Sequence, residues 1–158
     1  MTNSESGWEV RPLSPRLGAE VICPKINNLN DDQVKKLKEL LLEHLVIFMP
    51  GQFLSPELLV EFGKRFGSLE GHPNLSSDDK LPREIFELKA SKGGIADEWH
   101  TDLTFRSSPA IMSIMHIVKC PEVGGDTLWS STYAAYDQLS SPMKDLCEGL
   151  TALHYAHP

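Results

Sequence analysis

The residue types with the clearest chemistry are an imidazole and a carboxylate, His100 and Asp102, which are two positions apart. In extended backbone, side chains at positions i and i+2 leave the same face, so both groups can reach one metal ion. One His and one carboxylate are two of the three ligands in the facial triad that holds non-haem Fe(II). The sequence therefore predicts a metal site, whose third ligand, a second His, should come from a distant segment.

The surroundings of this pair strengthen the prediction, because a His-x-Asp triplet alone is often incidental. Trp99 and Phe105 flank the pair with aromatic side chains that can keep water out of a metal pocket. A glycine-rich segment, Gly-Gly-Asp-Thr-Leu-Trp, follows at residues 124–129, and its Thr127 stands 27 positions after His100. The aspartate of this segment suits the turn after the two glycines better than a metal site.

Several motifs occur in an order that resembles the taurine dioxygenase and 2,4-dichlorophenoxyacetate dioxygenase family of Fe(II)/2-oxoglutarate oxygenases. The strongest are W-H-T-D-L-T-F at 99–105, G-G-D-T-L-W at 124–129 and A-A-Y-D-Q-L-S-S-P-M-K at 134–144. Further support comes from L-G-A-E-V at 17–21, H-L-V-I-F-M-P-G-Q at 44–52 and R-F-G-S-L-E-G-H-P at 65–73. Together they extend along almost the whole chain, and they are specific for the family rather than for a substrate.

The resemblance implies a role for each of five residues. His100 and Asp102 would be iron ligands, and Thr127 would hydrogen-bond the carboxylate of 2-oxoglutarate. His72 would contact the acid group of the substrate, and Phe105 would line the substrate pocket. The implied fold is a double-stranded β-helix, or jelly roll, in an α+β chain with N-terminal helices and a late helical insertion.

The resemblance also implies what lies beyond the motifs. Family members carry a distal His ligand and an Arg that pairs with 2-oxoglutarate in later barrel strands. We therefore expect residues 1–158 to form a single domain that is truncated before both. His154 matches a family His that is not the metal ligand, and His157, like His154, lies too close to the helical insertion to be the distal ligand.

The implied activity is hydroxylation, with O₂, of a small anionic compound of the taurine or sulfonate, alkyl sulfate or aryloxyalkanoate type. Taurine-type members carry an Asn shortly before the metal motif, whereas Ala96 stands at that position here, which argues against taurine itself. Two alternatives remain open. The chain is an inactive truncated fragment, or it is a jelly-roll metal-binding module without redox chemistry.

Composition excludes several classes of protein. With 15 basic and 22 acidic residues the net charge is −7, which argues against nucleic acid as a partner. Apolar runs are short, so no membrane span is predicted, and the polar start has no features of a secretory signal. Three cysteines without paired spacing suit reduced thiols in the cytoplasm. Homo-oligomerisation of a full-length parent is left open.

Helical spacing and capping residues predict the helices. Asn30 with Gln33 three residues later is a capping box before the apolar series Val34, Leu37, Leu41 and Leu45. Ser55 followed by Pro56 begins a second helix that should close at Gly67. Two short helices are expected at 133–139 and 142–150. Strands are expected at 19–23, 45–49, 85–89, 110–119 and 126–130 around an antiparallel core, and residues 1–16 are expected to be a loose arm.

Overall fold

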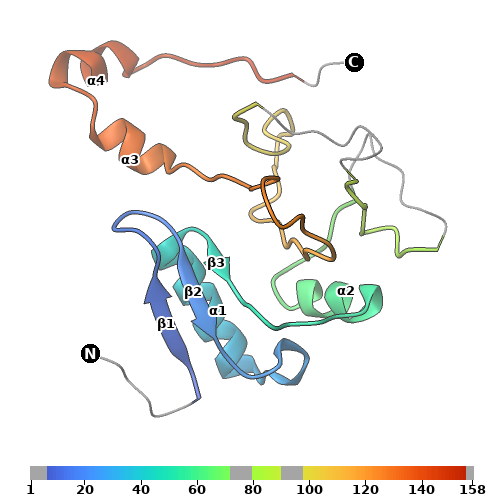
Figure 1. Ribbon diagram of the computed structural model, residues 1–158. Helices are drawn as coiled ribbons and strands as arrows, with labels where there is room; N and C mark the ends of the chain where they lie inside the picture. The colour runs from blue at the N-terminus through green and yellow to red at the C-terminus, as the bar shows by residue number, and fades with distance from the viewer. Residues whose placement is uncertain (1–6, 72–79, 90–97, 156–158) are drawn as a thin grey trace.

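The computed structural model describes residues 7–71, 80–89 and 98–155. The chain begins with a three-stranded sheet in the order β1-β2-β3, formed by β1 (Glu9–Pro12), β2 (Ala19–Ile22) and β3 (Ile47–Phe48) (Figure 1). β1 and β2 pair antiparallel, with Val10 opposite Val21, whereas β2 and β3 pair parallel, with Ala19 opposite Ile47. This sheet is therefore mixed and not the antiparallel core that the sequence predicted.

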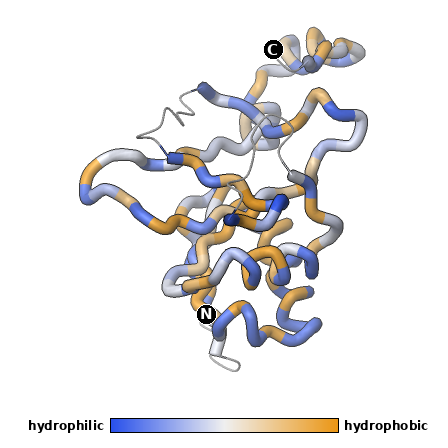
Figure 2. The backbone as a smooth tube through the Cα atoms, turned by 90° about the vertical axis from the view of Figure 1, so that its right-hand side faces the viewer, coloured by the Kyte–Doolittle hydropathy of each residue, from blue (hydrophilic) through white to orange (hydrophobic). Residues whose placement is uncertain are grey.

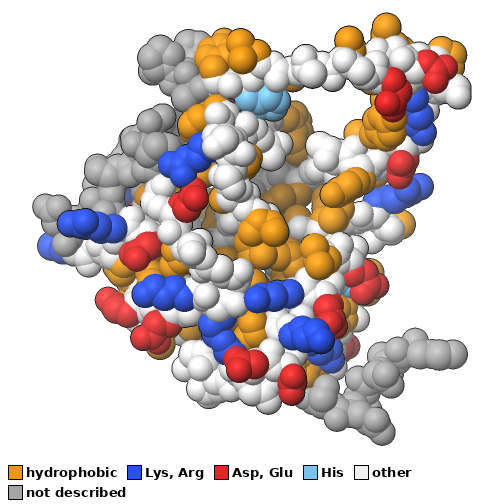
Figure 3. Space-filling model, turned by 180° about the vertical axis from the view of Figure 1, so that it is seen from behind, with side chains coloured by type: hydrophobic (Ala, Val, Ile, Leu, Met, Phe, Trp, Pro, Cys, Tyr) orange, Lys and Arg blue, Asp and Glu red, His pale blue; other side chains and the backbone are white. Residues whose placement is uncertain are grey.

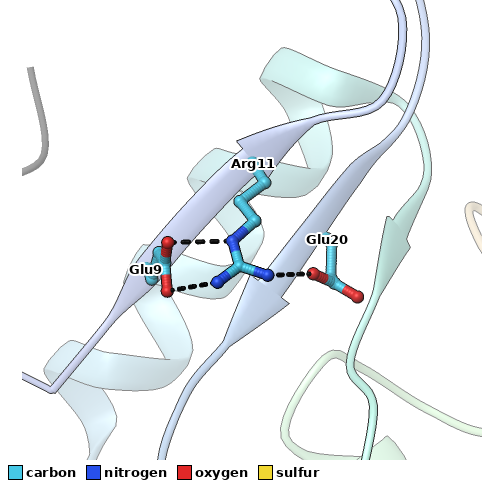
Figure 4. Close-up of polar contacts among 3 residues, drawn as sticks. All are labelled: Glu9, Arg11 and Glu20. Carbon is cyan, nitrogen blue, oxygen red and sulfur yellow. Dashed lines mark hydrogen bonds and ion pairs between the residues drawn. The ribbon is translucent and has the colours of Figure 1, made fainter.

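Strand β1 corrects the prediction that residues 1–16 form a loose arm. The strand is only four residues long and ends at Pro12, so its sequence is too short to show a clear alternation of polar and apolar side chains. Its pairing with β2 and an ion network on the exposed face hold it in place. Arg11 Nε lies 2.8 Å from Glu9 Oε1, and Arg11 Nη1 lies 3.2 Å from Glu20 Oε2 (Figure 4). Residues 1–6 lie outside the described part of the chain.

The two N-terminal helices begin where their capping residues predict. Helix α1 (Asp31–His44) has the complete capping box, in which the Asn30 side chain accepts from Gln33 N and the Gln33 side chain accepts from Asn30 N, both at 2.9 Å. Helix α2 (Pro56–Lys64) is capped by Ser55, which accepts a hydrogen bond from Leu58 N. It ends before the expected Gly67. A short 3₁₀ helix, η1 (Ile26–Asn28), lies between β2 and α1.

The hydrophobic core lies between the sheet and α1, and η1 and α2 extend it. Val21 from β2 and Leu37 from α1 are fully buried at its centre. Burial of such side chains is the main favourable contribution to folding. The buried residues of this cluster are Trp8, Val21, Ile26, Leu29, Val34, Leu37 and Phe62. All of them precede residue 63, so the core belongs to the N-terminal part of the chain.

The later part of the chain contains two short helices, α3 (Thr132–Asp137) and α4 (Ser141–Cys147), and long irregular segments (Figures 1 and 2). Both helices were predicted, with longer bounds. The strands expected at 85–89, 110–119 and 126–130 are absent, because in the described residues only β1, β2 and β3 form ladders. A strand needs a hydrogen-bonded neighbour, and an apolar run by itself does not supply one.

This later part also leaves many large apolar side chains exposed. No residue of 80–89 or 98–155 is buried, and Ile111, Val118 and Leu153 are each more than four-fifths exposed. Figure 3 shows apolar side chains gathered at the surface across the middle of the face opposite to that of Figure 1. Among the described residues, no helix combines the length and the apolar character needed to cross a bilayer.

Candidate metal centre

His100 and Asp102 lie side by side at the start of a turn that continues to residue 105. Their closest atoms, His100 Nε2 and Asp102 Oδ1, are 3.2 Å apart, and both side chains are more than half exposed. His100 and Thr101 belong to no helix or strand, the turn begins at Asp102, and the imidazole and the carboxylate two positions apart are in contact. Their roles as metal ligands remain a prediction.

The second ring nitrogen of His100 fixes the tautomer of the ring. His100 Nδ1 lies 2.8 Å from the carbonyl oxygen of Glu98, and a carbonyl can only accept, so Nδ1 carries the hydrogen. In the neutral ring the lone pair is then on Nε2, the nitrogen that faces Asp102. Backbone carbonyls orient metal-binding histidines in this way in many metal sites.

The donor atoms of the pair fit a divalent metal ion. Bonds from such an ion to nitrogen and carboxylate oxygen are about 2.0–2.2 Å long, so one ion can contact two atoms that are 3.2 Å apart. An imidazole with one carboxylate is a donor set suited to Fe(II). Within the described residues, no third His, Cys, Asp or Glu joins the pair to make a group of three.

The turn that follows Asp102 has an unusual backbone. Leu103 has φ of 54°, in the left-handed region, which costs a residue with a Cβ about 1–2 kcal/mol. Arg106 N donates to Leu103 O at 3.0 Å and closes the turn. The guanidinium of Arg106 also pairs with the carboxylate of Glu70, which lies 36 positions earlier. The surroundings therefore hold a strained backbone next to one of the two candidate ligands.

Thr127 occupies a separate segment of the surface. It follows a bend in which Gly124 and Gly125 both have positive φ, 78° and 72°, a backbone conformation that favours glycine. Two residues later, Trp129 packs edge-on against Phe48 of β3, with ring centroids 5.3 Å apart. Within the described residues, no hydrogen bond joins Thr127 to His100 or Asp102, so the structure does not bring the three together by direct contact.

Of the two predicted substrate-binding residues, only Phe105 belongs to the part of the chain that the structure describes. Phe105 lies in the turn after Asp102 and is 37% exposed. His72 lies outside the described residues, as does Ala96. Trp99, expected to keep the pocket dry, is itself 71% exposed.

Sequence reasoning missed four features of this part of the chain. The carbonyl of Glu98 and the left-handed Leu103 are backbone properties that their residue types do not reveal. The Arg106–Glu70 pair is signalled only by opposite charges in two separate motifs. The fourth feature is a contact of His154, whose Nδ1 lies 2.9 Å from Thr104 Oγ1, 50 positions away.

Two curated proteins with similar sequences are named for action on sulfate esters. The chain is 37% identical over 154 residues to an alkylsulfatase from Acinetobacter baylyi, covering 96% of this chain and 48% of that protein. It is 35% identical over 148 residues to an alpha-ketoglutarate-dependent sulfate ester dioxygenase from Pseudomonas putida, covering 92% and 49%. The chain thus spans about half the length of the curated relatives it matches.

A solved structure and a family model agree with these relatives. A taurine dioxygenase from Burkholderia xenovorans superimposes with a TM-score of 0.71 and 30% sequence identity, over 90% of this chain and 51% of that one. The family model described as taurine catabolism dioxygenase TauD, TfdA family matches residues 9–158. The match confirms the resemblance inferred from the motifs: the chain belongs to the TauD/TfdA family of dioxygenases.

Proposed function

We propose that this chain provides the first half of the catalytic domain of an Fe(II)- and 2-oxoglutarate-dependent dioxygenase that hydroxylates a small anionic compound. The observation that supports this most directly is the pairing of His100 Nε2 with Asp102 Oδ1 at 3.2 Å. The fixed tautomer of His100 adds to it, because the nitrogen facing the carboxylate is then free to bind a metal. Relatives named as alpha-ketoglutarate-dependent dioxygenases agree with this chemistry.

Each predicted residue has a definite task in this proposal. His100 and Asp102 hold Fe(II), and the Thr127 hydroxyl donates a hydrogen bond to a carboxylate of 2-oxoglutarate. Phe105 packs against the substrate, and His72 donates a hydrogen bond to its anionic group. With these groups bound, 2-oxoglutarate, O₂ and a substrate C–H bond are converted into succinate, CO₂ and a C–OH group. The protein positions the reactants and shields them from water.

The proposed fold of a complete domain is a double-stranded β-helix in which residues 98–130, irregular in this structure, would pair as strands. The apolar runs in this region and their exposure support it, since such segments need neighbouring strands on both sides. In a complete domain the neighbours would correspond to the half of the relatives that this chain does not match. The same half would supply a second His ligand and an Arg for 2-oxoglutarate.

Alkyl sulfates are the substrate class that we favour. The names of two relatives, an alkylsulfatase and a sulfate ester dioxygenase, point to this class. Ala96, in place of the Asn of taurine-type members, argues against taurine. Hydroxylation of the carbon that bears the sulfate oxygen gives an unstable product that releases the sulfate.

The net charge of −7 does not favour nucleic acid as a partner, and three free cysteines suit the cytoplasm.

The test compares two proteins, the 158-residue chain and the same chain fused to the unmatched half of the Acinetobacter baylyi alkylsulfatase. Each receives Fe(II), ascorbate and 2-oxoglutarate with an alkyl sulfate, an alkanesulfonate or an aryloxyacetate, and succinate is measured. We expect the fusion to release succinate with the alkyl sulfate, and the chain alone to release none above background. His100→Ala and Asp102→Ala should each abolish turnover by the fusion.

A fusion that folds and binds Fe(II) but forms no succinate with any of the three compounds would contradict the proposal. That outcome would favour a metal-binding module without redox chemistry, which the exposure of both candidate ligands also allows. Enzyme-like turnover by the chain alone would show instead that these 158 residues already suffice.

A further inference from the structure

Side-chain exposure alternates along residues 111–117. Met112, Ile114 and His116 are half-buried, whereas the residues between and beside them are exposed. An alternation with a period of two residues is typical of a segment that has a different environment on each of two sides. The segment belongs to no helix or strand of this structure, so the pattern comes from its packing and not from a hydrogen-bonded ladder.

The half-buried side of this segment rests on the N-terminal core. Ile114 packs against the core cluster, and its Cδ1 would lie 3.7 Å from a Cβ placed on Gly63 of α2. The same Cβ would lie 3.0 Å from Leu69 Cδ2, which is closer than carbon atoms pack without displacement. Helix α2 therefore has a glycine at the place where Leu69 and Ile114 approach it. The contact of Ile114 determines which side of the segment faces outward.

The opposite side of the segment is apolar and open to solvent in the described chain. We call Ile111, Met115 and Ile117 the outward row, and their side chains are 86%, 53% and 57% exposed. Between Arg106 and Lys119 the sequence has no acidic residue, lysine or arginine. Exposed apolar rows of this kind mark contacts with another layer of protein more often than they face water.

The length of the relatives indicates what covers this row. In the alkylsulfatase and in the solved taurine dioxygenase, a part that this chain does not match makes up about half of the protein. A row without charges has no electrostatic attraction for a charged partner, and its burial is favourable only against an apolar layer. The unmatched half of the relatives is the part of the same proteins that is available to provide such a layer.

We propose that the outward row is the surface through which this chain joins the complementary half of the domain, and that the two halves associate even as separate polypeptides. The contact of Ile114 with the core presents the row before the other half is bound. The inference goes beyond the proposed function, because it concerns assembly and not the reaction.

The test co-expresses the 158-residue chain with a separate, tagged polypeptide, the half of the Acinetobacter baylyi alkylsulfatase that this chain does not match. We expect the unaltered chain to be recovered with the tag in a one-to-one complex. Met115→Lys and Ile117→Lys should each lower the recovered amount roughly tenfold or more, because burial of an unpaired ammonium group is costly. Val123→Lys, at a side chain that is 90% exposed and outside the row, is the matched control and should be recovered like the unaltered chain.

The urea midpoint of the isolated chain separates loss of docking from loss of folding. Met115→Lys and Ile117→Lys should leave this midpoint nearly unchanged, since both side chains are more than half exposed in the chain alone. Ile114→Lys should lower it, because Ile114 packs against the core. A loss in Ile117→Lys as large as the loss in Ile114→Lys would overturn the inference.

The other outcomes also decide the matter. Failure to recover the unaltered chain with the tag would overturn the inference, and so would an equal loss of recovery in Val123→Lys and Ile117→Lys. Dimers of the chain that Ile117→Lys converts into monomers, without binding of the separate half, would show that a second copy covers the row. Turnover by the fusion does not require separate chains to associate, so the proposed function stands or fails independently.

Discussion

Residues 7–71 and residues 98–155 are segments of similar length that bury their apolar side chains very differently. The first segment contains every buried residue among those described, packed between a sheet and α1. The second segment carries the candidate ligands His100 and Asp102 and the glycine-rich turn, and it has no buried residue. The fold is therefore stabilised in one part of the chain while the proposed chemistry lies in the other.

Side-chain contacts from separate places connect the two segments. Ile114 packs against the N-terminal core, and Trp129 contacts Phe48 of β3 edge-on. The Arg106–Glu70 pair adds a polar contact. Single substitutions can remove these contacts one at a time and so test what holds the second segment against the core.

The core of the first segment provides the largest expected effect. Leu37 is fully buried in α1, so Leu37→Ala should lower the free energy of unfolding by about 2–5 kcal/mol. Leu42, in the same helix but 75% exposed, is the matched control, and Leu42→Ala should cost less than about 0.5 kcal/mol. Urea denaturation followed by helical circular dichroism measures both. Equal losses of unfolding free energy in the two variants would contradict a core that contacts only one face of α1.

An intermediate effect is expected where the two segments meet. Ile114 is partly buried against the core, so Ile114→Ala should cost about 1–2 kcal/mol. Ile111→Ala, three residues earlier at a side chain that is 86% exposed, should change the free energy of unfolding little. If both variants unfold like the unaltered chain, then residues 110–119 do not rest on the core in solution.

The smallest effect concerns the exposed ion network on β1. The hydrogen bond from Arg11 holds the pKa of Glu9 below its ordinary value of 4.5. Because this pKa is lower in the folded chain, the stabilisation is present above pH 4.5 and is lost as the pH falls through the folded value. An NMR titration should show the pKa of Glu9 rising toward 4.5 in Arg11→Met and, by screening, in high salt.

Arg16→Met serves as the control for this titration. Arg16 is also exposed but forms no ion pair with Glu9, so its loss should leave the pKa of Glu9 unchanged. An equal shift in both variants would mean that net charge, and not the hydrogen bond from Arg11, lowers the pKa.

The sequence predicted the elements whose signals are local. Helix α1 follows from a capping box and an apolar series within about fifteen residues, and α2 from Ser55 and Pro56. The contact between His100 and Asp102 was also predicted locally, from their spacing, and their role as metal ligands stays a prediction. The strands expected at 110–119 and 126–130 were wrong for the described chain, because a ladder depends on a second segment that periodicity does not reveal.

The parts of the site that escaped prediction are non-local or conformational. Nothing in the residue types of Thr104 and His154 shows that they meet across 50 positions. Leucine is a residue that seldom has positive φ, so the turn at Leu103 goes against its local preference. Such exceptions to local rules are expected at functional or strained sites.

The glycine turn at Gly124 and Gly125 has a consequence for how this sequence can vary among organisms. A Cβ on Gly125 would stand 3.1 Å from Pro121 Cγ, so backbone conformation and crowding both oppose any replacement. Gly124 has nothing within 4 Å, so only its backbone conformation limits it, and Asn or Asp tolerates that conformation. Natural variants of this segment should accordingly accept Asn or Asp at the first glycine and retain the second.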